Sequence, residues 1–215
     1  SDPTIADAST SGLITGKNRG ETAVIVRYLK FIETPLLTFV QDVDNFVWNG
    51  PPTFNYIDEN VDQKLKQLQY QPASVCSDET FVRRVHLDVL GTLPTIEDSD
   101  RFLTDTSPEK RKRLIDELLG RPDFAMFWSQ KWGDLLRVSR KQIGLNSVLK
   151  YSQWLQGTIS NNMPYDQFVR ELLTASGSTI TSPAGNYYRT AADTMDAMES
   201  TAQLFMGTRI QCAKC

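Results

Sequence analysis

Hydrophobic positions in residues 54–215 recur with the period of an α-helix. Ile57, Val61, Leu65 and Leu68 are spaced so that they share one helix face. Cap residues, prolines and glycines divide the rest of this range into short segments with the same period. We expect helices at about 57–68, 77–90, 95–103, 107–119, 122–136, 148–159, 164–173 and 191–205, with a loop at 176–187.

The N-terminal part follows a different pattern. Residues 22–28 and 36–40 are rich in β-branched and aromatic side chains, which is typical of strands. Residues 1–19 are rich in Ser, Thr, Asp and Gly and predict a flexible tail. The predicted fold class is mainly α, a multi-helix orthogonal bundle with a short N-terminal β-hairpin segment. The predicted divisions are 1–19, 20–50 and 54–215.

The composition excludes several classes of protein. Of 215 residues, 40% are hydrophobic and the net charge is −3, so the chain is neither disordered nor suited to coat nucleic acid. No apolar run approaches the roughly 20 residues of a membrane-spanning helix. The chain has a single histidine, His86, and we find no Ser-His-Asp set, no H-E-x-x-H motif and no glycine-rich phosphate loop.

Four segments of the helical range together resemble one known family. They are FVRRVHLDVLGTLPT at 81–95, FWSQKWGDLLR at 127–137, NMPYDQFVR at 162–170 and FMGTRIQCAKC at 205–215. In this order they resemble the planctomycete cytochrome-associated (PSCyt-type) domain of unknown function. Residues 20–28 are similar to the last strands of a bacterial immunoglobulin-like domain.

The resemblance implies a cellular setting rather than a reaction. Family members belong to large exported proteins, so we expect a periplasmic or cell-surface location and partners among other domains of the same parent protein. Relatives often carry c-type cytochrome modules, but they have no established activity. The oligomeric state stays open.

Cys212 and Cys215 form a C-x-x-C motif at the end of the chain. Heme c needs two such thiols and an adjacent histidine, which the family pattern places directly after Cys215. We therefore expect a truncated motif, with heme c attached only in a longer chain and no cofactor or metal in these 215 residues. A disulfide or half of a zinc site are the alternatives.

Charged residues on two predicted helices are candidates for either packing or chemistry. Arg84 and Asp88 are four positions apart, Asp134 and Arg137 are three apart, and Arg83 precedes Arg84. We expect a buried or half-buried network of ion pairs that fixes helix packing. The alternative is an enzyme acting on extracellular carbohydrate with Asp88 and Asp134 as its catalytic carboxylates.

Two apolar pairs have helical spacing. Trp128 and Trp132 are expected to belong to the aromatic core, with a platform for a sugar or a heme edge as the alternative. Met195 and Met198 are expected to fill the core, with axial ligation of heme as the alternative.

Two further polar side chains have structural interpretations. Cys76 is expected to be a small buried hydrophobic residue, or to pair with Cys212 or Cys215 in an oxidising compartment. His86 is expected to pack within its helix, because the resembled family commonly has tyrosine there.

The sequence alone thus predicts a non-catalytic helical module of an exported multidomain protein, linked to c-type heme or redox chemistry in a longer chain. We expect no activity in this fragment. A carbohydrate enzyme and a structural cell-surface spacer are the alternatives.

Overall fold

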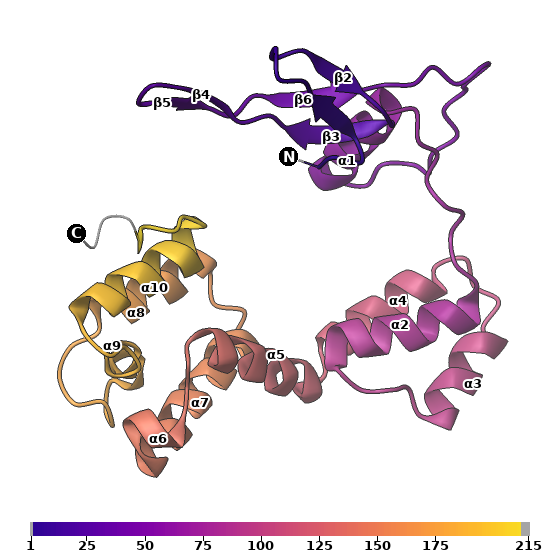
Figure 1. The fold of residues 1–215 in the computed structure, drawn as a ribbon. Helices are drawn as coiled ribbons and strands as arrows, with labels where there is room; N and C mark the ends of the chain where they lie inside the picture. The colour runs from indigo at the N-terminus through magenta and orange to yellow at the C-terminus, as the bar shows by residue number, and fades with distance from the viewer. Residues whose placement is uncertain (1, 212–215) are drawn as a thin grey trace. The chain divides into compact units, whose positions relative to one another are not determined.

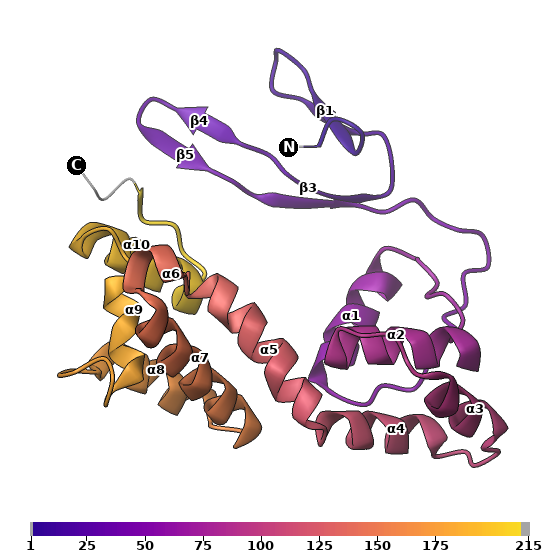
Figure 2. The same ribbon diagram turned by 90° about the horizontal axis from the view of Figure 1, so that it is seen from below.

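The computed structural model describes residues 2–211 (Figures 1 and 2). The chain divides into two compact units, Ser1–Val75 and Cys76–Cys215. In the described residues, the strands lie in the first unit together with one helix, and the remaining helices lie in the second. The prediction of a mainly α fold with short N-terminal antiparallel strands is confirmed.

The first unit consists of antiparallel strand pairs and one helix. β1 pairs with β2, β3 with β6, and β4 with β5. β4 and β5 continue the hairpin that β3 and β6 begin, because the Val24 N–H donates to the Pro35 carbonyl between the two pairs, 3.0 Å apart. The bounds are β1 Ala6–Ala8, β2 Ile14–Gly16, β3 Gly20–Ala23, β4 Val26–Tyr28, β5 Phe31–Glu33, β6 Leu36–Phe39 and α1 Tyr56–Gln67.

Residues predicted as a loose tail instead form the β1–β2 hairpin. The Ser9 hydroxyl accepts the Leu13 N–H at 3.0 Å, and the Ser9 N–H donates to the Leu13 carbonyl at 2.9 Å. Gly12 supplies the positive φ of 85° that the turn requires. The same Ser and Gly residues that suggested looseness therefore close a specific turn.

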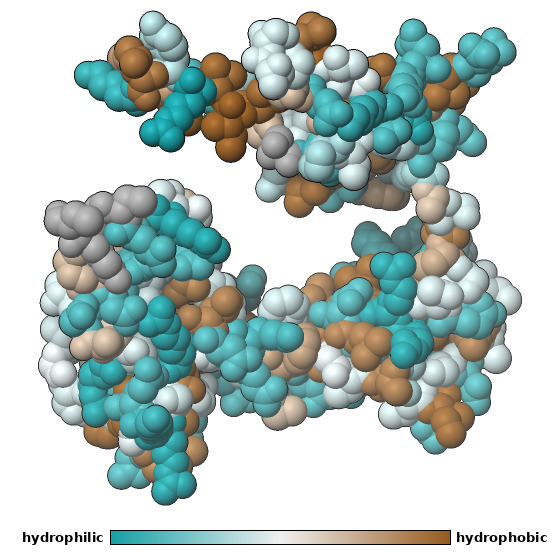
Figure 3. Space-filling model, in the orientation of Figure 1, coloured by the Kyte–Doolittle hydropathy of each residue, from teal (hydrophilic) through white to brown (hydrophobic). Residues whose placement is uncertain are grey.

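The β4–β5 hairpin carries exposed apolar side chains (Figure 3). Its tip is a two-residue turn in which Leu29 has a φ of 53° and is 76% exposed. Tyr28 and Phe31, which face each other across the pair, are also exposed. Strand pairing alone stabilises such a hairpin only marginally. The immunoglobulin-like remnant stays a prediction.

The second unit is built from short helices joined by tight turns. Their bounds are α2 Asp78–Leu90, α3 Ile96–Thr104, α4 Lys110–Leu119, α5 Pro122–Leu135, α6 Arg140–Ile143, α7 Leu145–Ser160, α8 Tyr165–Thr174, α9 Asn186–Arg189 and α10 Thr194–Met206, with a 3₁₀ turn at Pro183–Gly185. None of the helices in the described part of the chain is long and apolar enough to cross a bilayer.

Capping residues fix where several helices begin and end. Ser77 accepts the Thr80 N–H at the start of α2, and Gly91 ends that helix at a φ of 71°. Thr95 accepts the Asp98 N–H at the start of α3. The helix predicted at 107–119 begins later, at Lys110, because the Ser107 hydroxyl accepts the Glu109 N–H in a preceding turn.

Two groups of buried side chains hold this unit together, and α5 runs from one to the other (Figure 2). The first group lies on α2, α3 and α4, and the second on α5 to α9. The first comprises Val82, Val85, Leu90, Phe102, Leu114 and Leu118. The second comprises Leu136, Ile143, Tyr151, Leu155, Phe168, Leu172, Ala184 and Tyr187.

The segment predicted as a loop at 176–187 contains local structure. The fully buried Asn186 donates from its amide to the carbonyls of Thr179 and Pro183, 3.1 and 3.0 Å away. Arg189 donates to the Asn186 side-chain oxygen at 3.0 Å. Polar hydrogen bonds, rather than a repeat of hydrophobic residues, hold this segment together. The pattern of hydrophobic positions therefore did not predict the 3₁₀ turn or α9.

An ion-pair cluster joins the starts of α2 and α4 and makes stability pH-dependent. Asp78 lies 2.6 Å from the Lys110 ammonium and 2.7 Å from the Arg111 guanidinium. These partners, Lys110 first, hold the pKa of Asp78 below its usual value. A depressed pKa contributes stability above the unfolded-state pKa, and that contribution is lost as pH falls through the folded-state pKa.

We expect Asp78→Asn to lower the urea midpoint of unfolding at pH 6, and the difference from the unmodified chain to disappear near pH 2. Asp88→Asn is the matched control, because Asp88 is exposed on the same helix. If the urea midpoint of Asp78→Asn were lower than that of the unmodified chain by the same amount at pH 6 and pH 2, the ion pairs of the Asp78 carboxylate would not be the cause.

Candidate functional site

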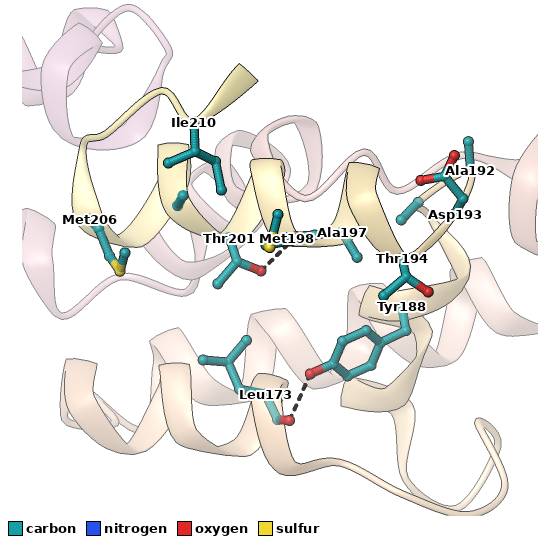
Figure 4. A pocket seen from close by; sticks show the side chains of 12 residues that line it. Leu173, Tyr188, Ala192, Asp193, Thr194, Ala197, Met198, Thr201, Met206 and Ile210 are labelled. Carbon is teal, nitrogen blue, oxygen red and sulfur yellow. Dashed lines mark hydrogen bonds between the residues drawn. The ribbon is translucent and has the colours of Figure 1, made fainter. Parts of the chain in front are cut away.

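A groove of about 830 Å³ runs along α10 (Figure 4). One side is formed by α10, and the opposite side by the end of α8 and the residues around the end of α9. The wall is mainly apolar. The residues that line it are Leu173, Tyr188, Ala191, Ala192, Asp193, Thr194, Ala197, Met198, Thr201, Ala202, Met206 and Ile210.

Local sequence signals build both ends of the groove. Asp193 caps α10 by accepting the Asp196 N–H at 2.8 Å. At the other end, Gly207 has a φ of 64°, and the Thr208 N–H donates to the Ala202 carbonyl at 3.1 Å. This is the hydrogen-bond pattern that reverses a chain after a helix. It brings Ile210 back over the groove.

Three of the four polar side chains in the groove wall, those of Tyr188, Asp193 and Thr201, are hydrogen-bonded within the protein. The Tyr188 hydroxyl donates to the Leu173 carbonyl at 2.8 Å, and the Thr201 hydroxyl donates to the Ala197 carbonyl at 2.7 Å. The Tyr187 and Thr201 hydroxyls also lie 2.8 Å apart. Burial raises the pKa of Tyr187, so its hydroxyl stays protonated at neutral pH. The surface left for a ligand is therefore chiefly apolar.

The predicted methionine pair faces outward. Met195 and Met198 are 38% and 42% exposed, so the prediction that they fill the core is wrong. The buried side of α10 is instead centred on Ala202, with Leu204 and Phe205 packed against the second core group. Met198 lines the groove, whereas Met195 does not appear in its lining.

Cys212 and Cys215 lie outside the described residues. Cys76, which was expected to be buried, is half-buried just before α2. Among residues 2–211, no three His, Cys, Asp or Glu side chains gather in a way that could hold a metal ion.

The charged residues predicted as an ion-pair network do not pair with one another in the described structure. Arg83, Arg84, Asp88 and Asp134 are exposed on the outer faces of α2 and α5. Arg137 instead forms an ion pair with Asp196 of α10, with 2.9 Å between Nη1 and Oδ2. Arg137 therefore pairs with Asp196, which is distant in the sequence, instead of with Asp134, three positions away. The spacing of residues along one helix does not reveal such a partner.

His86 is buried on α2 and is 1% exposed. Its Nδ1 is 2.9 Å from the Val82 carbonyl oxygen, and its Nε2 is 3.8 Å from the Asp98 carboxylate. Asp98 also binds Arg101 at 2.8 Å and lies 3.5 Å from Arg121. The sequence did not indicate this His–Asp approach, because the two residues belong to different helices.

The two tryptophans of α5 have different environments. The Trp128 indole N–H donates to the Val89 carbonyl at 3.1 Å, and its ring is 36% exposed. Trp132 packs against the second core group and meets Phe168 edge to face, with ring centroids 5.1 Å apart.

Comparison with known proteins identifies a family. The profile of the PSCyt2 family, described as a protein of unknown function (DUF1549), matches residues 56–215. The matched range includes every segment on which the resemblance to the cytochrome-associated domain was based. No curated protein and no solved structure matches the chain.

Proposed function

The chain belongs to the PSCyt2 family of proteins of unknown function, and we propose that its helical unit is a non-catalytic module of an exported multidomain protein. In this proposal the unit carries a c-type heme, bonded to Cys212 and Cys215 when a histidine follows Cys215. The observation that carries the proposal is the apolar groove of α10, whose lining ends at Ile210.

The groove is within reach of the cysteine motif. Cys212 follows Ile210 by two residues, and two residues of extended chain span about 7 Å. A porphyrin bonded at Cys212 therefore has apolar surface available beside its point of attachment. Because most polar side chains of the groove wall are hydrogen-bonded within the protein, a porphyrin face that covers the wall leaves few donors or acceptors unpaired.

The residues present fit a porphyrin in size and chemistry. A volume of about 830 Å³ falls within the range of sites that hold cofactors, and the wall is mainly aliphatic. Met198 brings a thioether to the wall, and methionine is an established axial ligand of c-type heme. Heme c would supply one-electron transfer, and the groove would exclude water from one of its faces.

The exposed carboxylates support a non-catalytic role. Asp88 and Asp134 lie on different helices, and both are exposed. A general acid is commonly held in a partly buried site, and these exposed positions do not supply one.

The test uses the natural chain extended beyond Cys215 and produced in cells with the periplasmic heme c maturation system. We expect a Soret absorption band, together with heme that stays on the polypeptide in a denaturing gel. Replacing both Cys212 and Cys215 by alanine should abolish covalent attachment, whereas Met195→Leu should leave it intact. An extended chain without heme, in cells that load a reference cytochrome c, would refute the proposal.

A further inference from the structure

A second cavity lies among α5, α7 and α8, away from the residues that line the α10 groove. Its volume is about 170 Å³, and its walls include Trp132 of α5, Thr158 of α7 and Tyr165 of α8. At roughly 30 Å³ of liquid volume per water, it holds about six waters or one small ring.

Four aromatic side chains line this cavity: Phe124, Trp132, Tyr165 and Phe168. Trp132 and Tyr165 have ring centroids 6.1 Å apart, and Tyr165 and Phe168 are stacked at 6.4 Å. Phe168 is buried, but Tyr165 is 54% exposed. Tyr165 thus lines the cavity and is also exposed to solvent, so a ligand can contact its side chain.

The polar groups of the cavity are neutral. Asn162 lies at the mouth in the turn before α8, with a φ of 47°. Within residues 2–211, no hydrogen bond involves its side-chain amide. The Thr158 hydroxyl donates to the Leu155 carbonyl at 2.8 Å and keeps its oxygen as an acceptor. Since no charged side chain lines the cavity, it favours an uncharged ligand.

An adjoining cavity of about 500 Å³ shares Phe124, Ile159 and Asn162 with the first. It adds the Ser160 hydroxyl and the Arg121 guanidinium. Arg121 already forms an ion pair with Asp123, 2.8 Å apart. The two cavities adjoin at these shared residues, and we call them together the cleft of α5, α7 and α8. Its aromatic end, the first cavity, has no charged side chain in its lining. A ligand of two linked rings held at that end would extend toward the polar groups of the adjoining cavity.

We propose that this cleft binds a neutral carbohydrate, with one pyranose ring stacked on Tyr165 beside Trp132. A sugar ring combines apolar C–H faces, which suit aromatic rings, with a rim of hydroxyls, which suit Asn162 and Thr158. The ligand class follows from this combination of aromatic walls and uncharged polar groups. The site is independent of the α10 groove and involves neither Asp88 nor Asp134.

The test is a calorimetric titration of the chain with glucose, galactose, N-acetylglucosamine and their β-linked disaccharides, with indole as an apolar probe. We expect saturable binding of at least one sugar, tighter for the disaccharide. Tyr165→Ala should weaken it about tenfold, which corresponds to about 1.4 kcal/mol, and Tyr165→Phe should preserve most of it. Asn162→Gly keeps the left-handed backbone accessible and should also weaken binding.

Tyr56→Ala is the matched control, because Tyr56 is 72% exposed on α1. It should bind sugar like the unmodified chain, and circular dichroism should show that every variant is folded. Three results would overturn the proposal: no saturable binding of any sugar, binding of indole in preference to sugar, or full sugar affinity in Tyr165→Ala.

Discussion

Replacing Leu118 by alanine should lower the free energy of unfolding of the helical unit by about 2–5 kcal/mol. Leu118 is 0% exposed and packs in the first core group with Leu114 and Phe102. The substitution removes buried apolar surface and leaves a cavity that short, well-capped helices cannot fully close. Denaturant unfolding followed by far-ultraviolet circular dichroism measures the loss.

The next residue in the chain provides the control. Leu119 lies on the same helix and is 47% exposed. Leu119→Ala removes the same atoms from a side chain that is already partly exposed to solvent. We therefore expect the free energy of unfolding to fall by less than about 1 kcal/mol. Equal losses in the two variants would mean that α4 does not bury the face described here.

Replacing Gly91 by alanine should cost roughly 2–4 kcal/mol. Gly91 ends α2 with a φ of 71°, which alanine adopts only with strain. In addition, its Cβ would lie 2.2 Å from Cε2 of Phe127, so the ring of α5 would have to move. Thermal or denaturant unfolding of the purified variant measures the effect.

Gly207→Ala separates the two causes. Gly207 has a similar φ of 64°, but a Cβ built there meets no atom within 4 Å. This variant should lose only the backbone component, about 1 kcal/mol. If Gly91→Ala and Gly207→Ala lost the same amount, the close approach of α2 and α5 at Phe127 would be contradicted.

Helix positions were predictable because their signals are local. Ser77 and Gly91 mark the two ends of α2 in the sequence, and the structure places both in the expected cap geometry. The periodic residues Val82 and Val85 are buried as their spacing indicates. Such features depend only on residues within one or two turns, so a single sequence contains them.

Features that join distant segments were not predictable in this way. Arg137 pairs with Asp196, and His86 approaches Asp98, across helices whose packing no spacing rule specifies. The groove of α10 uses Tyr188, which lies between the predicted loop at 176–187 and the predicted helix at 191–205. It also uses Ile210, which follows the chain reversal at Gly207. The resemblance to a family identified the cysteine motif but gave no surface on which a heme could lie.

Nuclear magnetic resonance of methionine methyl groups tests the central claim, that a heme bound at the cysteine motif lies in the α10 groove. The described chain contains all five methionines, and Met198 and Met206 line the groove, whereas Met126, Met163 and Met195 do not appear in its lining. In the extended, heme-loaded and reduced chain, ring currents should shift the Met198 and Met206 signals most, relative to the heme-free chain. Met126 and Met163 should stay nearly unchanged. Largest shifts at Met126 or Met163, or no methionine shift in a chain that carries covalent heme, would contradict the account.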